Sequence, residues 1–201
     1  MAAEPREIAL FPLNTVLFPQ GPLQLRIFEP RYLDMVSECM RNESPFGVCL
    51  IESGSEAGRP ATPYGTGTLA HINDWRRNDD GLLGIGAVGG RRFTVLDTRV
   101  QPDGLLRGTI EELADEPPAT LPDDLCYMRD ILAEVFERTA SLYSGQRHYD
   151  DASWVGYRLA EILSLPLTRK QYFLELEDPL LRLTQLDEIL RAMSESVGDS
   201  S

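Results

Sequence analysis

Phe28-Glu29-Pro30-Arg31-Tyr32-Leu33-Asp34-Met35-Val36 is the stretch that decides how this chain is expected to fold. It follows the run Leu23 to Ile27, whose alternation of apolar and polar residues predicts a strand with one buried face. Pro30 suits the first turn of a helix, because its N–H is not needed there and its φ is already helical. Apolar residues then recur at the spacing of one buried helical face: Tyr32, Met35, Val36, Cys39 and Met40. The stretch therefore predicts a strand, an abrupt turn and a short amphipathic helix.

Further motifs occur in a fixed order on both sides of this stretch. They are Phe11-Pro12-Leu13-Asn14-Thr15-Val16-Leu17-Phe18-Pro19, Phe46-Gly47-Val48, Gly67-Thr68-Leu69-Ala70, Gly90-Arg91-Arg92-Phe93, Trp154-Val155-Gly156-Tyr157-Arg158-Leu159-Ala160 and Asp178-Pro179-Leu180-Leu181-Arg182-Leu183. Together they resemble the N-terminal substrate-binding domain of ATP-dependent Lon proteases over nearly the whole chain. The resemblance implies recognition of a substrate or partner without catalysis, because it does not extend to the ATPase motor or the proteolytic domain.

The composition is that of an ordinary soluble globular protein. The chain has 201 residues, of which 42% are hydrophobic and 25% are charged, enough for one large or two small cores. No apolar run approaches the roughly 20 residues that a membrane span needs. Residues 1–7 lack the hydrophobic segment of a secretory signal. We therefore expect a cytoplasmic protein without a membrane partner.

The net charge of −13 is concentrated in the C-terminal half. Residues 1–110 hold 13 acidic and 11 basic residues, whereas residues 111–201 hold 19 acidic and 8 basic ones. Such a surface repels phosphate, so we expect no nucleic-acid partner. An RNA-binding PUA-like module is the alternative, and it would be favoured by convergence of the basic residues on one face. Those residues are Arg76, Arg77, Arg91, Arg92 and Arg107.

Residues 1–115 are predicted to form a β-rich subdomain. Short apolar or alternating segments separated by turn residues predict a small sandwich or barrel, and Asp103-Gly104 predicts a hairpin. The resemblance implies that this part is a PUA-like barrel. The predicted strands are Ile8 to Leu13, Leu23 to Ile27, Phe46 to Ile51, Thr66 to Ile72, Leu82 to Val88, Phe93 to Leu96 and Leu105 to Ile110.

Residues 116–195 are predicted to form an acidic helical subdomain. A proline-rich connection, residues 114–120, precedes a change to helical periodicity, and residues 196–201 read as a disordered tail. Four helices are expected, over residues 120–145, 151–165, 168–176 and 178–193, with Thr168 and Gln171 as a capping box. The predicted fold class is α+β, a PUA-like β-barrel domain followed by a C-terminal helical bundle.

Motifs that carry chemistry are absent or lack their structural context. Gly84 to Gly89 spells G-x-G-x-x-G, but a strand-like segment follows it where a dinucleotide site needs a helix, so we interpret it as a glycine-rich strand. Cys39, Cys49 and Cys126 lie in apolar periodic segments and are expected to be buried, reduced thiols.

The remaining candidates for catalysis are two histidines and one lysine. His71 and His148 have no metal-ligand spacing, although His148 lies near Asp150 and Asp151. Lys170 is the sole lysine, and it lies in a capping segment that offers nothing to depress its pKa. We therefore expect no catalytic residue, no metal and no cofactor. A small-molecule enzyme is the third alternative, and a deep pocket joining a histidine to carboxylates would favour it.

A recognition surface needs exposed apolar or aromatic groups, although most aromatic residues are expected in the core. Trp75 is the strongest candidate, because polar residues surround it in what reads as a loop. Glu29 and Arg31 are either a cap with a surface ion pair or a brace of the turn against the helical half. The candidate partner-binding residues are Trp75, Phe28, Glu29, Arg31, Tyr32, Phe46, Arg92 and Trp154.

The predicted function is that of a non-catalytic peptide- or protein-binding module. It would offer an unfolded or extended segment either a sheet edge or the groove between the two halves. A separate protease and a second copy of the chain in a weak homo-oligomer are further candidate partners.

Overall fold

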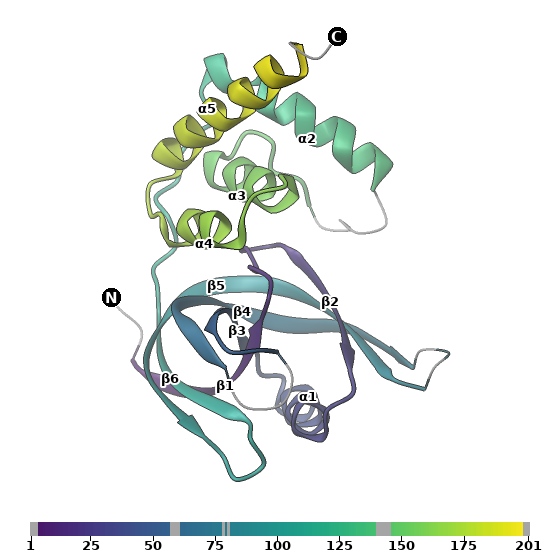
Figure 1. Ribbon diagram of the computed structural model, residues 1–201. Coiled ribbons are helices and arrows are strands. Elements are labelled where there is room, and N and C mark those ends of the chain that lie inside the picture. The colour runs from purple at the N-terminus through teal and green to yellow at the C-terminus, as the bar shows by residue number, and fades with distance from the viewer. Residues whose placement is uncertain (1–3, 57–60, 78, 80, 140–145, 199–201) are drawn as a thin grey trace. The chain divides into compact units, whose positions relative to one another are not determined.

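A computed structural model describes residues 4–56, 61–77, 79, 81–139 and 146–198 of the chain (Figure 1). By contacts within the chain, it divides into two compact units, Met1–Asp115 and Glu116–Ser201, called unit 1 and unit 2 below. The structure combines a mixed sheet in unit 1 with five α-helices distributed over both units.

Unit 1 is built on a six-stranded sheet with the order β2-β5-β4-β3-β1-β6 (Figure 1). The pairing of β1 with β3 is parallel and the other pairings are antiparallel. Strand β6 pairs with β1 on one side and with β5 on the other, so the last strand in this order is also hydrogen-bonded to the second. Assignment of unit 1 as a PUA-like barrel stays a prediction. The strands are β1 Arg6–Leu13, β2 Pro22–Ile27, β3 Phe46–Ser53, β4 Thr62–Arg77, β5 Leu83–Val100 and β6 Leu106–Glu112.

The deciding stretch folds as its sequence predicts. After β2, Glu29 is extended, and α1, Pro30–Asn42, begins at the proline. The helix buries Tyr32, Met35 and other residues of its apolar face in the core of unit 1, where the Tyr32 ring stacks on Phe11 at 3.8 Å between centroids. Met40, expected on the buried face, is 40% exposed instead.

Strand β5 is one continuous element of 18 residues, although two separate strands are predicted from its sequence. Its glycines do not interrupt it, because the backbone of Gly89 takes part in pairing with a neighbouring loop. The Gly89 N–H donates to the Gly21 carbonyl at 2.9 Å, and the Gln20 N–H donates to the Gly89 carbonyl at 2.7 Å. The G-x-G-x-x-G segment therefore lies within a strand, which confirms its interpretation as glycine-rich strand.

Unit 2 contains four α-helices and a short 3-10 helix. Instead of one long helix over residues 120–145, the structure has the 3-10 turn η1 followed by α2, and residues 140–145 lie outside the described part of the chain. Helix α3 contacts α2, α4 and α5, while the predicted bundle arrangement stays a prediction. The elements are η1 Asp123–Leu125, α2 Tyr127–Arg138, α3 Ala152–Ile162, α4 Leu167–Glu175 and α5 Pro179–Gly198. The segment expected to be disordered, 196–201, is helical as far as Gly198, and residues 199–201 are outside the described part.

Two of the helices in unit 2 begin at aspartates. Asp151 caps α3 by accepting the N–H of Trp154 at 3.1 Å, and Asp178 accepts the N–H of Leu180 at 2.9 Å at the start of α5. The capping box predicted for α4 is wrong. This helix begins one residue earlier, after Pro166, and Gln171 is buried and donates to Glu175 at 2.7 Å.

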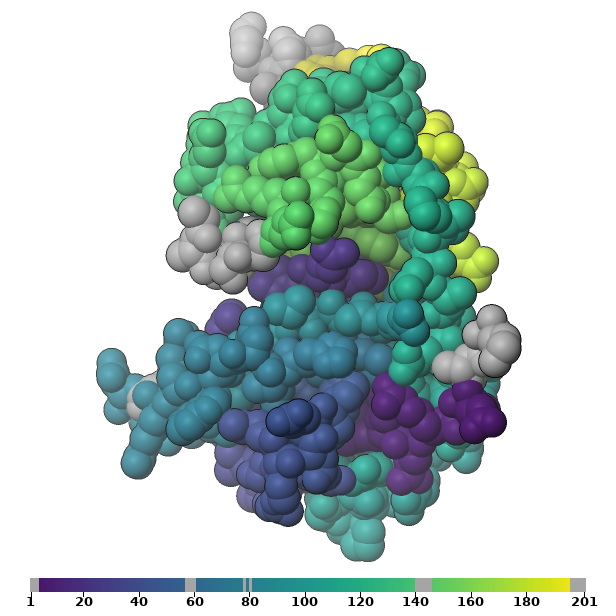
Figure 2. Space-filling view, turned by 180° about the vertical axis from the view of Figure 1, so that it is seen from behind, coloured from purple at the N-terminus to yellow at the C-terminus, as the bar shows by residue number. Residues whose placement is uncertain are grey.

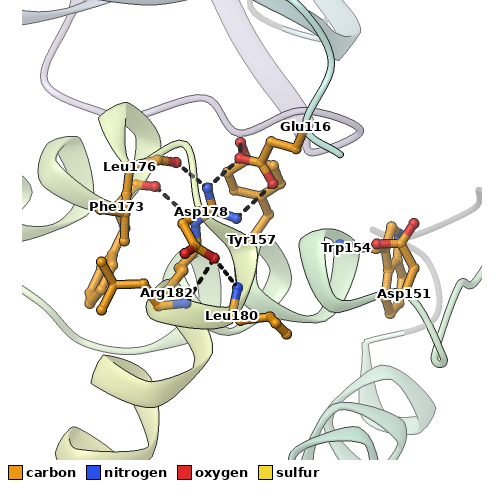
Figure 3. Close-up of polar contacts among 10 residues, drawn as sticks. Glu116, Asp151, Trp154, Tyr157, Phe173, Leu176, Asp178, Leu180 and Arg182 are labelled. Carbon is orange, nitrogen blue, oxygen red and sulfur yellow. Dashed lines mark hydrogen bonds and ion pairs between the residues drawn. The ribbon is translucent and has the colours of Figure 1, made fainter. Parts of the chain in front are cut away.

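A buried ion pair lies at the start of unit 2 (Figure 3). Arg182 of α5 is 0% exposed, and its guanidinium donates to the carboxylate of Glu116 at 3.0 Å and to the Phe173 carbonyl at 3.0 Å. The same guanidinium lies 3.9 Å from the ring centroid of Tyr157, whose hydroxyl donates to Glu116. A buried charge is tolerated only when it is paired and hydrogen-bonded in this way.

The pKa of Glu116 reflects this pairing. Burial acts to raise the pKa of the carboxyl, but the hydrogen bond and the charge of Arg182 and the hydrogen bond from Tyr157 outweigh burial. The net effect holds the pKa of Glu116 below its ordinary value. Glu116, the first residue of unit 2, therefore contacts Arg182 of α5 as a charged carboxylate and not as a neutral acid.

Candidate functional site

Strand β4 has an edge that is only partly covered. On one side it pairs with β5 as far as Arg77↔Leu83, but on the other side its pairing with β3 stops at Phe46↔Ala70. Within the described residues, no strand pairs with the β3 side of β4 beyond Ala70. The segment His71–Trp75, called the open edge below, therefore presents an edge that another strand can join.

A cavity of about 290 Å³ lies along the open edge. Its walls are the C-terminal end of α1 with the residues after it, and five consecutive residues of β4. Within this lining, the pairing of β4 with β5 shifts register between Ile72 and Asp74, an irregularity that interrupts the alternation of side chains. The lining residues are Cys39, Met40, Glu43, Ser44, His71, Ile72, Asn73, Asp74 and Trp75.

Trp75 supplies the largest exposed apolar surface of this cavity. Its side chain is 59% exposed, which confirms the prediction that it faces solvent, but it lies on β4 and not in a loop. The β4–β5 hairpin that carries it projects from the rest of unit 1 (Figure 2). Met40 of α1 adds a second exposed apolar side chain to the same cavity.

The backbone of Trp75 is satisfied locally. Its N–H donates to the Oδ1 atom of the neighbouring Asp74 at 2.9 Å. Such a contact between a side chain and the adjacent backbone offers a substitute for a ladder hydrogen bond. An incoming strand can replace it with a carbonyl oxygen, which frees the Asp74 carboxylate for contact with the bound segment.

Carboxylates give the cavity its charge. Glu43 follows α1 in the left-handed conformation, with φ 50° and ψ 36°, and Asp74 lies on the β4 side. His71 is the one basic residue in the lining.

The predicted pair Glu29 and Arg31 is found at the start of α1. Their side chains form an ion pair at 2.7 Å, and the Arg31 guanidinium donates to the Gly104 carbonyl at 2.9 Å. Arg31 is buried, so this is not a surface ion pair, and it braces the turn against the β5–β6 hairpin of its own unit. The brace against the helical half stays a prediction.

The other predicted partner-binding residues differ widely in exposure. Phe28 is 62% exposed but does not line the cavity. The other candidates are buried in the cores of their own units, which keeps them from direct contact with a partner in the folded state. These buried residues are Tyr32, Phe46, Arg92 and Trp154. Phe46 contributes indirectly, because β3 begins at this residue and the open edge begins opposite it.

Of the nine residues that line the cavity, only Trp75 was among the predicted partner-binding residues, and Met40 and Glu43 are two that sequence reasoning missed. Met40 fitted the apolar stripe of α1 and was therefore assigned to the core. Glu43 carried a usable signal, since the position after a helix usually holds glycine or asparagine and this chain has an acid there. The open edge itself depends on where the N-terminal end of β3 lies relative to β4, and no sequence motif indicates that position.

The arginines on which an RNA-binding alternative depends are largely occupied. Arg92 is buried, Arg91 donates to Asp115 at 3.0 Å, and Arg107 donates to Glu38 at 2.7 Å. Arginines that are buried or ion-paired add little positive potential to a surface. Their convergence into a phosphate-binding face is therefore unsupported.

A second cavity, of about 400 Å³, lies in unit 2 around His148. Asp150 and Asp151 also line it, but the Asp151 side chain caps α3 and the His148 ring makes an edge contact with Trp154 at 6.3 Å between centroids. In the described part of the chain, no group of three His, Cys, Asp or Glu residues could hold a metal ion. The arrangement offers caps and packing contacts, not a set of reacting groups.

The surroundings of Lys170 differ from the prediction. Burial lowers the pKa of this lysine, where no depression is expected from its sequence. Its Nζ donates to the Glu161 carbonyl at 2.7 Å, so a backbone group holds the amine.

Among the thiols, Cys39 and Cys49 are buried as predicted, and Cys126 is only half-buried. No helix in the described residues has the length and apolarity that crossing a membrane requires.

Comparison with known proteins gives consistent matches over the chain. The family model of the ATP-dependent protease La (LON) substrate-binding domain matches residues 7–192. Among solved structures, the chain is similar to a Lon N-terminal domain protein from Xanthomonas campestris, with 38% identity, a TM-score of 0.72, and coverage of 90% of this chain and 96% of that chain. The N-terminal domain of the Mycobacterium avium complex Lon protease shares the fold, at 16% identity and a TM-score of 0.62 over 91% and 97% of the two chains.

Curated relatives are longer than this chain. A Lon protease of Anaeromyxobacter dehalogenans is 24% identical over 203 residues, which are 95% of this chain and 24% of the relative. The chain spans about a quarter of the length of the first curated relatives it matches. These matches confirm the resemblance that the ordered motifs predict.

Proposed function

Because this chain belongs to the LON substrate-binding domain family, we propose that it recognises extended segments of other polypeptides and performs no chemistry on them. The observation that carries the proposal is the open edge of β4 with a cavity beside it. A bound segment continues the sheet at the point where β3 begins, at Phe46 opposite Ala70. Delivery of the bound segment to a separate protease is the role that such recognition would serve.

The binding free energy has two sources in this geometry. Main-chain hydrogen bonds to the open edge provide affinity with little demand on sequence. Trp75 and Met40 then cover an apolar part of the bound segment, for which a rigid indole and a flexible thioether are both suited. Together they favour unfolded clients, because folded proteins rarely expose a free extended segment.

The proposal is tested by titrating a reduced and alkylated, permanently unfolded protein. Trp75 and Trp154 are the two tryptophans of the chain, so Trp154→Phe leaves Trp75 as the reporter in this assay. We expect saturable binding at micromolar concentration and a blue shift of Trp75 emission as the exposed indole is covered. Trp75→Ala should weaken binding about tenfold, as for a central interface aromatic.

Phe28→Ala is the matched control for Trp75→Ala. Phe28 is an equally exposed aromatic residue of unit 1 that does not line the cavity, so its removal should leave binding unchanged. The proposal fails if the unfolded protein does not bind, or if both variants bind like the unchanged protein. A single-stranded RNA arm tests the alternative function, and steeply salt-dependent RNA binding would favour it.

A further inference from the structure

We infer that the bound segment carries an arginine or lysine, whose side chain enters the cavity between Glu43 and Trp75. This inference rests on the proposed function and adds to it the chemical class of the substrate. It follows from the charge of the cavity walls, from the position of Glu43 and from the exposed indole.

Glu43 is an acid at a place where the backbone and the helix both disfavour one. Its left-handed conformation is uncommon for residues other than glycine and asparagine. It directly follows α1, and the C-terminal end of a helix carries partial negative charge, which repels a carboxylate. Unfavourable residues that persist in a structure are often found where function requires them.

The cavity matches the side chain of a basic residue along its length. Glu43 and Asp74 supply negative charge from its two walls, α1 and β4. The exposed indole of Trp75 can receive the cation on its face, and Met40 can cover the aliphatic part of the side chain. An acidic residue at the same place would meet two like charges, so the cavity discriminates by charge as well as by shape.

The test compares two dodecapeptides of alternating Thr and Val that differ only in one central residue, Arg or Gln. We expect the Arg peptide to bind the full chain at least fivefold more tightly at low salt, and the difference to shrink at 0.5 M salt as screening increases. Glu43→Asn removes the charge and keeps a residue that tolerates the left-handed conformation. It should reduce the preference for Arg at least threefold and leave the affinity for the Gln peptide unchanged.

Gln20 provides a matched control for the backbone at Glu43. It is the other described non-glycine residue with positive φ, at 60°, and it does not line the cavity. Glu43→Gly and Gln20→Gly should both raise the melting temperature, because both relieve a left-handed residue. Only Glu43→Gly should also lose the preference for Arg.

Each outcome bears on a different part of the inference. Equal binding of the two peptides overturns the charge preference and leaves the proposed function standing. A preference that survives in the double variant Glu43→Asn, Asp74→Asn overturns the assignment to this cavity. If neither peptide nor the unfolded protein binds, the proposed function fails as well.

Discussion

At the scale of single residues, the buried pair of Glu116 and Arg182 is a contact on which the stability of unit 2 depends. Glu116→Gln leaves the buried guanidinium of Arg182 without its counter-charge. Breaking a buried pair in this way typically costs about 3–5 kcal/mol. We expect the free energy of unfolding to fall by that amount at pH 7, as measured by urea unfolding monitored through the helical signal. Glu134→Gln removes an exposed partner of Arg138 and should cost less than about 0.5 kcal/mol.

The same pair makes a prediction about pH. The pKa of Glu116 is held below its ordinary value, with burial opposing and Arg182 dominating among the lowering effects. A carboxyl whose pKa is lower in the folded than in the unfolded state contributes stability above the unfolded pKa and loses it as the pH falls through the folded one. The stability difference between the unchanged protein and Glu116→Gln should therefore be constant near neutral pH and close as the pH falls below about 4. A difference that stays constant throughout that range would contradict the charged pairing.

The thiols are predicted to differ in reactivity. Burial raises the pKa of Cys49 to about 12, and burial also raises the pKa of Cys39. The thiolate is the reactive form, so both residues should be inert in the folded state. A thiol reagent should label the half-buried Cys126 first, and Cys39 and Cys49 only in urea. Rapid native labelling of Cys49, read by mass spectrometry, would show that its site opens.

The sequence predicts the exposure of a residue where its neighbours in the chain decide it, and fails where a distant partner does. The polar neighbours of Trp75 were enough to predict an exposed side chain. Nothing near Arg31 or Arg182 in the chain indicates that these side chains are buried. Their partners are distant in the sequence: Arg31 donates to the carbonyl of Gly104, and Arg182 donates to the carboxylate of Glu116. Burial of a charge is decided by a partner far away in the sequence, which local patterns do not contain.

At the scale of elements, the close approach of β5 to the loop before β2 can be tested at Gly89. A Cβ atom added there would lie 2.2 Å from the carbonyl oxygen of Phe18, which is backbone and cannot move aside cheaply. Gly89→Ala should destabilise the protein by about 1–3 kcal/mol, in the range of overpacked sites. Gly65→Ala in β4 is the matched control, because nothing lies within 4 Å of its added Cβ. Equal stability of the two variants in urea unfolding would contradict the packing described.

The pattern of strands was predictable, whereas the site was not. Alternating apolar residues identify β2, and Pro30 identifies the start of α1. The open edge exists because β4 has 16 residues and β3 has 8, so that β4 continues beyond its neighbour. This mismatch emerges only when the register of the two strands is known, and register depends on pairing that the local sequence does not specify.

At the scale of the whole molecule, the open edge places the proposed binding of an extended segment within unit 1. All residues that line the candidate cavity belong to unit 1. Binding at the open edge should therefore slow amide hydrogen exchange over residues 71–77 and 39–44, where new hydrogen bonds form and water is excluded. Exchange throughout α2, α3, α4 and α5 should be unchanged.

Hydrogen exchange of the full chain, read by mass spectrometry with and without the Arg dodecapeptide, tests this placement in unit 1. Trp75→Ala serves as the control, because it should reduce the protection over the open edge without altering exchange in unit 2. Protection that spans segments of both units would instead contradict binding confined to the open edge. Protection confined to the open edge would mean that recognition resides in the sheet of unit 1. There β4 extends past the N-terminal end of β3 and leaves backbone groups for a partner to bind.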